Sequence, residues 1–209
     1  MDELTKVLIV DDHKSLRNSF EKEFCPDNGF KVVGSIGAAA QAEAECHSTR
    51  PDIVIMDVCT VGEISGLKAA EAIIKQNPKV KIIVTSGFEE ISYIPRAKEI
   101  GAHAFVNKDS DLDYFREVAH RVLNGEYVFP EPKTIPLPTG EAPFSKREME
   151  VLRLLCRQVS NQEIADELHI SYNTVRRHIE NMRQKAGFDT ATELVIYVIS
   201  NGWINPNTK

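Results

Sequence analysis

The sequence predicts an α/β fold, a doubly wound five-stranded parallel sheet, followed by a second, small all-α domain. Between residues 6 and 125, five short apolar runs alternate with five segments of helical periodicity, as in repeated β/α units. After residue 145 only helical periodicity remains, in four short segments. Five of the ten prolines fall between these two parts, in residues 126–144.

The strands of the predicted sheet are short and apolar. Residues 53–56 are apolar throughout, which is typical of a strand buried on both faces of a parallel sheet. The expected strands occupy residues 7–10, about 30–36, 53–56, 81–85 and 104–106. The helical patterns fill the intervals at about 14–25, 38–49, 67–77, 91–100 and 111–124.

The proline-rich stretch marks the boundary between the domains. Prolines at this density prevent a helix or a central strand and favour extended backbone, so the stretch is expected to be a semi-rigid linker. The predicted organisation is an α/β domain in residues 1–125, a linker in 126–144 and a helical domain in 145–209.

Helix-start signals divide the last part into four short helices. Ser145 with Glu148 has the spacing of a capping box, and Ser160 and Ser171 open the second and third helices. The fourth begins at Thr190 or Thr192. Helically spaced apolar residues follow each start, among them Val151, Leu152, Ile164, Leu168, Val175, Ile179, Met182, Leu194 and Val198.

Polar residues follow four of the five expected strands. They are Asp11 and Asp12, Asp57, Thr85 and Ser86, and Asn107 and Lys108. The carboxyl ends of parallel strands meet at one edge of a sheet, where ligands collect. A carboxylate there can accept a phosphoryl group if a metal and a cation offset the negative charge, and paired aspartates suit Mg2+. The pattern predicts a phosphoryl-transfer site. Asp57 would accept the phosphoryl group, Lys108 would supply a positive charge, and the Ser86 hydroxyl would donate a hydrogen bond to a phosphoryl oxygen.

Residues Val7 to about Asn124 resemble the receiver domain of bacterial two-component response regulators. The resemblance rests on Val10-Asp11-Asp12, Met56-Asp57, Ser86-Gly87 and Phe105-Val106-Asn107-Lys108. It implies a flavodoxin-like fold with Asp57 as phosphoacceptor. It also implies that Asp11, Asp12, Asp57 and the backbone carbonyl of Cys59 surround Mg2+. Ser86, 22 residues before Lys108, would be the switch hydroxyl in preference to Thr85. Phe105 would be the aromatic residue whose rotamer changes with the position of that hydroxyl.

The loop after Asp57 departs from the family. Receivers usually have a proline four residues after the acceptor and a glycine eight after it, whereas this chain has Thr60-Val61 and Gly66, nine residues after. The loop is expected to be one residue longer and less constrained, which affects metal affinity and phosphoryl lifetime rather than the identity of Asp57.

The last part resembles the LuxR-type helix-turn-helix of NarL/FixJ regulators. The motifs are Phe144-Ser145-Lys146-Arg147-Glu148, Ser160 to Ala165, Ile170-Ser171, Thr174 to Ile179, Lys185-Ala186-Gly187 and Glu193-Leu194-Val195. Its third helix is cationic opposite its apolar stripe, as a helix that enters a major groove should be. The expected DNA-contacting residues are Tyr172, Asn173, Thr174, Arg176, Arg177, His178, Arg183 and Lys185. Gln158 stands where a glycine is usual, and Thr190-Ala191 lacks the usual arginine.

Charge and cysteine content fit this interpretation. Residues 1–125 carry 15 basic and 20 acidic residues, whereas residues 145–209 carry 9 and 8, so nucleic-acid binding is expected in the second part. The four cysteines lack metal-ligand spacing and are expected to be reduced. The start of the sequence has no signal-peptide pattern, and no apolar run is long enough to span a membrane, so a cytoplasmic location is expected.

The sequence therefore predicts a DNA-binding transcriptional response regulator rather than an enzyme. A partner histidine kinase would phosphorylate Asp57, and the protein would bind double-stranded DNA as a homodimer, at least when phosphorylated. One alternative stays open, an orphan regulator whose acceptor site is unused and which is controlled by constitutive dimerisation or a protein ligand. A haloacid-dehalogenase-like hydrolase is disfavoured, because it needs a second acid two residues after Asp57, where Cys59 stands.

Overall fold

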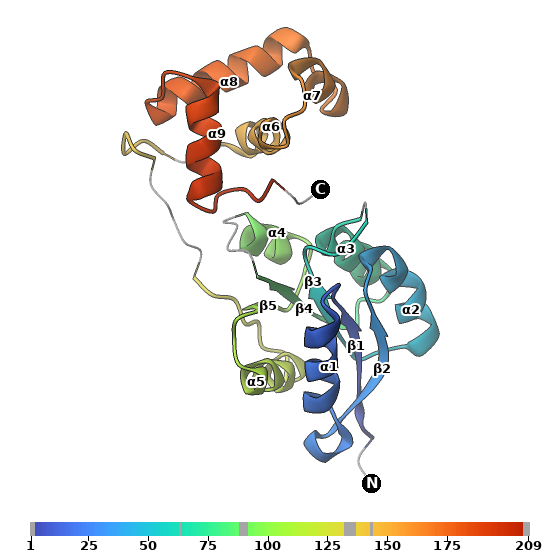
Figure 1. The fold of residues 1–209 in the computed structure, drawn as a ribbon. Coiled ribbons are helices and arrows are strands. Elements are labelled where there is room, and N and C mark those ends of the chain that lie inside the picture. Colours follow the sequence, from blue (N-terminus) through green and yellow to red (C-terminus); the bar gives the residue numbers. More distant parts are fainter. Residues whose placement is uncertain (1–2, 63, 88–91, 132–136, 143, 207–209) are drawn as a thin grey trace. The chain divides into compact units, whose positions relative to one another are not determined.

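The computed structural model describes residues 3–62, 64–87, 92–131, 137–142 and 144–206. These residues form two compact units. The first comprises the described residues within 3–87 and 93–131, and the second those from 137 to 206. Figure 1 shows a sheet with helices in the first unit and a cluster of helices in the second.

The first unit contains a five-stranded sheet in which every neighbouring pair is parallel. The strand order is β2-β1-β3-β4-β5, with β1, β3 and β4 in the interior of the sheet and β2 and β5 at its edges. This order confirms the predicted doubly wound five-stranded parallel sheet. The strands are β1 (Thr5–Val10), β2 (Phe30–Ile36), β3 (Ile53–Asp57), β4 (Lys81–Ser86) and β5 (Ala104–Asn107).

Five α-helices cover the two faces of this sheet. They are α1 (Lys14–Glu23), α2 (Ala42–Thr49), α3 (Gly66–Gln76), α4 (Tyr93–Glu99) and α5 (Leu112–Leu123). Alternate strand residues point to opposite faces. Ile55 therefore packs in the cluster with Phe20 of α1 and Phe115 of α5. Met56 packs in the opposite cluster, with residues of α2, α3 and α4.

Some helix boundaries differ from the predicted ranges for local reasons. The helix expected at about 14–25 ends at Glu23, and Cys25 is extended because it precedes Pro26. A short 3-10 turn over Ala39–Gln41 precedes α2, where a single helix from residue 38 was expected. The helix expected at about 91–100 is observed as α4, and residue 91 lies outside the described residues.

The second unit contains α6 (Lys146–Cys156), α7 (Asn161–Glu167), α8 (Tyr172–Ala186) and α9 (Ala191–Ser200), which confirms the predicted small all-α domain. A capping box joins Ser145 to Glu148, as the spacing predicted, and a second one joins Ser160 to Glu163. Thr190, not Thr192, caps α9. The buried core includes Trp203, whose ring centroid lies 5.5 Å from that of Phe144.

The ends of the predicted linker belong to the two units. Val128 forms a parallel bridge with Ala104 beside β5. Leu137 and Phe144 are buried in the core of the helical unit, and the Thr139 hydroxyl donates to the carbonyl of Lys185 at 2.6 Å. Residues of the predicted linker therefore pack on each of the two units. Pro132, Pro136 and Pro143 lie outside the described residues.

Among the described residues, no helix combines the length and the apolar character that crossing a membrane requires.

Candidate functional site

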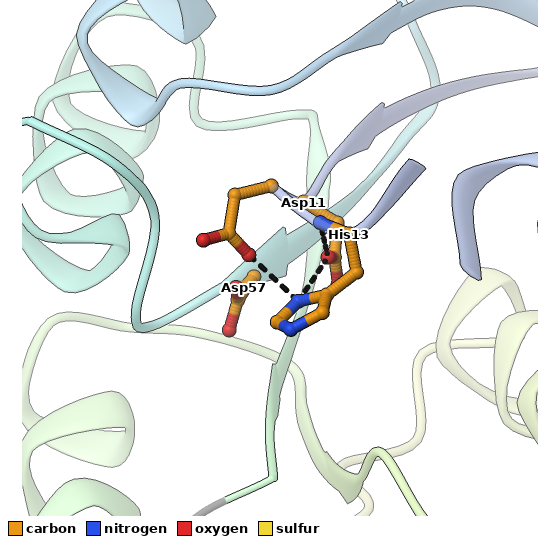
Figure 2. A group of neighbouring side chains, drawn as sticks. Asp11, His13 and Asp57 are labelled. Atoms are coloured by element: carbon orange, nitrogen blue, oxygen red, sulfur yellow. Dashed lines mark hydrogen bonds and ion pairs between the residues drawn. The ribbon is translucent and has the colours of Figure 1, made fainter. Parts of the chain in front are cut away.

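The acidic residues predicted at the strand ends come together at the carboxyl edge of the sheet. Asp57 is the last residue of β3, and Asp11 follows β1, which pairs with β3 in parallel register. Both side chains are buried, with Asp57 1% and Asp11 0% exposed. Figure 2 shows the carboxylates of Asp11 and Asp57 close together beside the ring of His13.

Lys108 forms ion pairs with both of these carboxylates. Its Nζ atom lies 2.7 Å from Asp11 Oδ2 and 2.8 Å from Asp57 Oδ2. Burial alone would lower the pKa of Lys108, but the hydrogen bonds with Asp11 and Asp57 raise it, so the side chain is an ammonium. Burial raises the pKa of Asp57 to about 6, against the opposing effect of Lys108. Asp57 is therefore a carboxylate held in a poorly solvated place.

Backbone groups hold the carboxylates in position. The N–H of Cys59 donates to Asp57 Oδ1 at 3.1 Å, and the N–H of His13 donates to Asp11 Oδ1 at 2.8 Å. The Arg17 guanidinium donates to the carbonyl of Asp11 at 2.6 Å. Arg17 was not among the predicted site residues, and only its place one turn into the helix after Asp11 could have indicated it.

The donor set fits a hard divalent cation. Asp11, Asp12, His13 and Asp57 each offer one ligand atom, and these atoms all lie within 4.8 Å of one another. Three of the four groups are carboxylates, the ligands that Mg2+ prefers. Cys59 is fixed beside them, with its Sγ atom 3.6 Å from the Tyr93 hydroxyl. The part assigned to the Cys59 carbonyl stays a prediction, and His13 is a neighbour that the sequence did not single out.

The two predicted switch residues are buried near this site. Ser86 ends β4, is 1% exposed and pairs with Asn107 of β5. Phe105 is 8% exposed and packs in the same apolar cluster as Tyr93 of α4. Thr85, the neighbour set aside in favour of Ser86, is also buried and lies opposite Asp57 in the sheet register. The placement brings Ser86 and Phe105 to the edge that carries Asp57.

The unusual loop after Asp57 is anchored at both ends. The Thr60 hydroxyl accepts from the N–H of Ala39 at 3.0 Å, whereas Val61 is 60% exposed. At the far end, a Cβ atom on Gly66 would lie 1.8 Å from the carbonyl oxygen of Asp57. Only glycine allows this approach, so Gly66 sets the path by which the loop returns to α3.

The residues at the start of α8 form an exposed polar surface. The Ser171 side chain caps the helix by accepting from the Thr174 N–H, and Val175 and Met182 are buried below. Arg176 and Arg177 are exposed. Of the other residues predicted to contact DNA, Tyr172 and Asn173 are exposed and Thr174 and His178 are half-buried. This surface lies on the face opposite the apolar stripe, as the sequence suggested.

Two of the predicted DNA-contacting residues, Arg183 and Lys185, make contacts inside the helical unit. Arg183 donates to the carbonyls of Phe188 and Asp189, both at 2.8 Å, and pairs with Glu180 at 2.7 Å. Lys185 lies 3.9 Å from the Glu148 carboxylate and 5.8 Å from the Phe144 ring centroid. Both side chains are half-buried, and their part in DNA binding stays a prediction.

An acidic site at the edge of a parallel sheet and a cationic helix on a separate helical unit define a two-domain regulator of the kind that binds DNA. The family described as "Response regulator receiver domain" matches residues 7–120, and that described as "Bacterial regulatory proteins, luxR family" matches residues 142–198. The chain belongs to the NarL/FixJ-type response regulators, a family of DNA-binding transcription regulators.

Individual relatives agree over almost the whole chain. The response regulator protein VraR of Staphylococcus aureus is 29% identical over 207 residues, which cover 95% of this chain and 98% of VraR. A structure of the Salmonella typhimurium RcsB response regulator matches with a TM-score of 0.59 at 20% identity, covering 95% of this chain and 99% of that one. A structure of an RcsB–DNA complex matches with a TM-score of 0.63 at 20% identity, covering 94% and 98%. These structures share the fold.

Proposed function

We propose that this response regulator is controlled by phosphorylation of Asp57, supplied by a partner histidine kinase, and that phosphorylation tightens its binding to double-stranded DNA. The observation that carries the proposal is the contact between Asp57 and Lys108. A buried carboxylate that is 2.8 Å from an ammonium and close to two further aspartates has the surroundings that a phosphoryl acceptor needs.

The chemistry follows from these contacts. An ionised Asp57 oxygen attacks the phosphorus of a phosphohistidine, so an O–P bond forms while the N–P bond breaks and the imidazole takes up a proton. Lys108 can follow the charge from the carboxylate to a phosphoryl oxygen, and Ser86 can donate its hydroxyl hydrogen to another. Mg2+ held by Asp11, Asp12, Asp57 and the Cys59 carbonyl would neutralise charge on the donor and on the attacking oxygen.

DNA binding belongs to the start of α8. Arg176 and Arg177 are exposed, follow a capped helix start and lie opposite the buried Val175. N-terminal residues of a recognition helix lie deepest in the major groove, so Tyr172 and Asn173 are suited to base contacts. The RcsB–DNA complex has the same fold with DNA bound, which supports this assignment.

A homodimer is the form in which we expect this protein to bind DNA. Two copies contact two half-sites, which raises both affinity and site length. Another solved structure contains two RcsB dimers bound to two parallel DNAs, and it matches this chain with a TM-score of 0.63 at 20% identity. Dimer formation promoted by phosphorylation would connect the acidic site to DNA binding without a new contact at α8.

Phosphorylation can be tested with a small phosphodonor. Wild-type protein, Asp57→Asn and the exposed control Asp27→Asn are incubated with acetyl phosphate and Mg2+, and intact mass is measured. We expect one added phosphoryl group on wild type and Asp27→Asn and none on Asp57→Asn. Equal modification of all three proteins would contradict the assignment of Asp57. No modification of any would favour the orphan regulator with an unused acceptor site.

A further inference from the structure

We propose that residues 127–129, which follow α5, form a strap on the edge strand β5, and that phosphorylation of Asp57 releases this strap and lengthens the tether to the helical unit. The strap consists of Tyr127, Val128 and Phe129. The inference rests on the proposed phosphorylation of Asp57 and deepens it, because it names the residues that connect the switch to the linker.

The backbone of the strap adds a short parallel segment to the sheet. β5 lies at the edge of the sheet, and Val128 forms a parallel bridge with Ala104 of this strand. The N–H of Phe105 donates to the Val128 carbonyl at 2.9 Å, and the N–H of Val128 donates to the His103 carbonyl at 3.0 Å. Figure 1 shows the chain after α5 passing beside β5. The predicted switch residue Phe105 is therefore hydrogen-bonded directly to the first part of the linker.

Two side chains of the strap pack on opposite faces of the sheet. Val128 is buried in the cluster that contains residues of α1 and α5. Phe129 packs against the other cluster, which contains Phe105 and residues of α4. The Nζ atom of Lys98 on α4 lies 5.1 Å from the centroid of the Phe129 ring, within the range of a cation–π contact. A change at Phe105 or in α4 therefore alters the packing of Phe129.

The start of the strap is fixed to the end of α5. The N–H of Glu126 donates to the Arg121 carbonyl at 3.0 Å, and the Glu126 carboxylate accepts from Arg121 Nε at 2.9 Å. The next ring, that of Tyr127, stacks on His103 with centroids 5.4 Å apart and an interplanar angle of 6°. Release of the strap therefore moves the chain after Glu126 and leaves α5 in place.

The strap is held weakly enough to be released. Its pairing with β5 is an isolated bridge rather than a ladder, and Pro130, which has no N–H to extend the pairing, follows at once. Tyr127 is 67% exposed, and Phe129 is half-buried. A segment with so little buried surface opens at a small cost in free energy, so a modest change beneath it shifts the equilibrium.

Phosphorylation reaches the strap through Phe105. In the proposed switch, Ser86 moves toward the phosphoryl group, and Phe105 fills the space that it leaves. This movement withdraws part of the surface against which Phe129 packs and so favours release. The three freed residues add about 10 Å to the reach of the tether that leads to Leu137, which is buried in the helical core. A longer tether restricts the position of the helical unit less, so two copies can contact two half-sites more readily.

Hydrogen–deuterium exchange of individual amides tests the release. Full-length wild type and Asp57→Asn are compared before and after treatment with acetyl phosphate and Mg2+, and intact mass is measured on each sample. We expect phosphorylated wild type to exchange the amides of Phe105 and Val128 at least about tenfold faster, because both hydrogen bonds of the strap are lost. The amide of Ile9 in β1 should keep its rate, and Asp57→Asn should not respond.

The mass measurement separates the two ways in which this test can fail. Phosphorylated wild type whose Phe105 and Val128 amides keep their rates would overturn the strap and leave the proposed acceptor site standing. Wild type that gains no phosphoryl group would overturn the proposed function and, with it, the release of the strap.

Variants of Phe129 test the strap without a phosphoryl group. Phe129→Ala removes its packing, Phe129→Leu keeps an apolar side chain, and Tyr114→Ala removes an exposed tyrosine of α5 outside the strap. We expect unmodified Phe129→Ala to exchange the Val128 amide at least about tenfold faster and to bind operator DNA about fivefold more tightly than wild type. The other two variants should behave like wild type. Unchanged exchange in Phe129→Ala, or faster exchange without tighter binding, would overturn the proposal.

Discussion

The Asp57 side chain carries a charged group in a buried position. Its position at the end of β3 removes it from water, which disfavours its charge, and Lys108 only partly compensates. A carboxylate buried in this way lowers the stability of the fold. An apolar or amide side chain would fill the same place with less penalty.

Replacing Asp57 by Asn should stabilise the first unit in a pH-dependent way. The pKa of Asp57 in the folded protein is about 6, above the unfolded value near 3.9. The folded state therefore holds the proton more tightly, and stability is lost as pH rises from about 4 through 6. We expect Asp57→Asn to raise the free energy of unfolding by about 1–3 kcal/mol at pH 7.5 and by little at pH 4. Urea titrations with a chelator present measure it, and a constant difference across pH would contradict the account.

Gly66 is constrained by a backbone contact rather than by a turn. Its own φ is not in the left-handed region, yet a Cβ atom would meet the Asp57 carbonyl oxygen at 1.8 Å. We expect Gly66→Ala to displace the loop after Asp57, to destabilise the unit by several kcal/mol and to slow phosphorylation by acetyl phosphate. Gly62 in the same loop has a φ of 106° and open space around its Cβ position, so Gly62→Ala adds backbone strain without crowding. Stability of Gly66→Ala equal to that of wild type would show that the loop can move to accommodate the methyl group.

At the scale of the element, the arginines at the start of α8 differ in their surroundings from the one near its end. Arg176 and Arg177 are exposed, whereas Arg183 holds the carbonyls of Phe188 and Asp189. We expect the double variant Arg176→Ala, Arg177→Ala to keep its stability within about 0.5 kcal/mol and to lose DNA affinity. Each lost phosphate contact should lower the salt slope by about one, and a lost base contact should cost ~1–3 kcal/mol at one position. Fluorescence titrations on operator and unrelated DNA distinguish a lost phosphate contact from a lost base contact.

The matched control for this prediction is Arg183→Ala, on the same helix. It should unfold at a lower urea concentration than wild type, because charge-assisted hydrogen bonds to the chain after α8 are lost. Unchanged DNA binding by the double variant would remove the start of α8 from the major groove.

The end of α6 carries a residue in an unfavourable conformation. Gln158 follows the C-cap residue Arg157 and has a φ of 59°, in the left-handed region where glycine is preferred. Its N–H donates to the carbonyl of Leu155 at 3.0 Å, so the turn is well formed despite the side chain. We expect Gln158→Gly to stabilise the helical unit by ~0.5–1 kcal/mol. A thermal melt that shows no gain would mean that the Gln158 side chain compensates for its strain.

The sequence predicted elements well where the pattern is local and repetitive. The five strands, the capping box at Ser145 and the acidic residues at the ends of β1 and β3 were all recognisable in this way. Contacts set by the fold were not, since nothing in the spacing places Arg17 on the Asp11 carbonyl or turns Arg183 back toward Phe188.

The structure of the proline-rich linker was also predicted only in part. Its prolines predicted a break in regular structure, but not that Leu137 would be buried in the helical core. Leu137 stands between two prolines in the sequence, and its burial depends on helices that lie farther along the chain.

At the scale of the whole molecule, the proposal requires that the acidic site of one unit controls DNA binding by the other. Movement of Ser86 toward a phosphoryl group would open space that Phe105 can fill, and such coupled movements shift an existing equilibrium by ~1–3 kcal/mol. We expect Ser86→Ala to be phosphorylated on Asp57 yet to bind DNA nearly as weakly as unmodified protein. Intact mass and DNA titration on the same sample check both. Full activation of Ser86→Ala would exclude this hydroxyl from the switch.

The most direct test of the central proposal is DNA affinity measured together with molecular mass, before and after phosphorylation. Wild type and Asp57→Asn are treated with acetyl phosphate and Mg2+ and then studied by analytical ultracentrifugation and by titration onto operator DNA. We predict that phosphorylation drives wild type toward dimers and tightens DNA binding about 5- to 150-fold, as a coupling of this size allows, while Asp57→Asn does not respond. Fully phosphorylated wild type that shows no shift toward dimers and no change in DNA affinity would contradict the proposal.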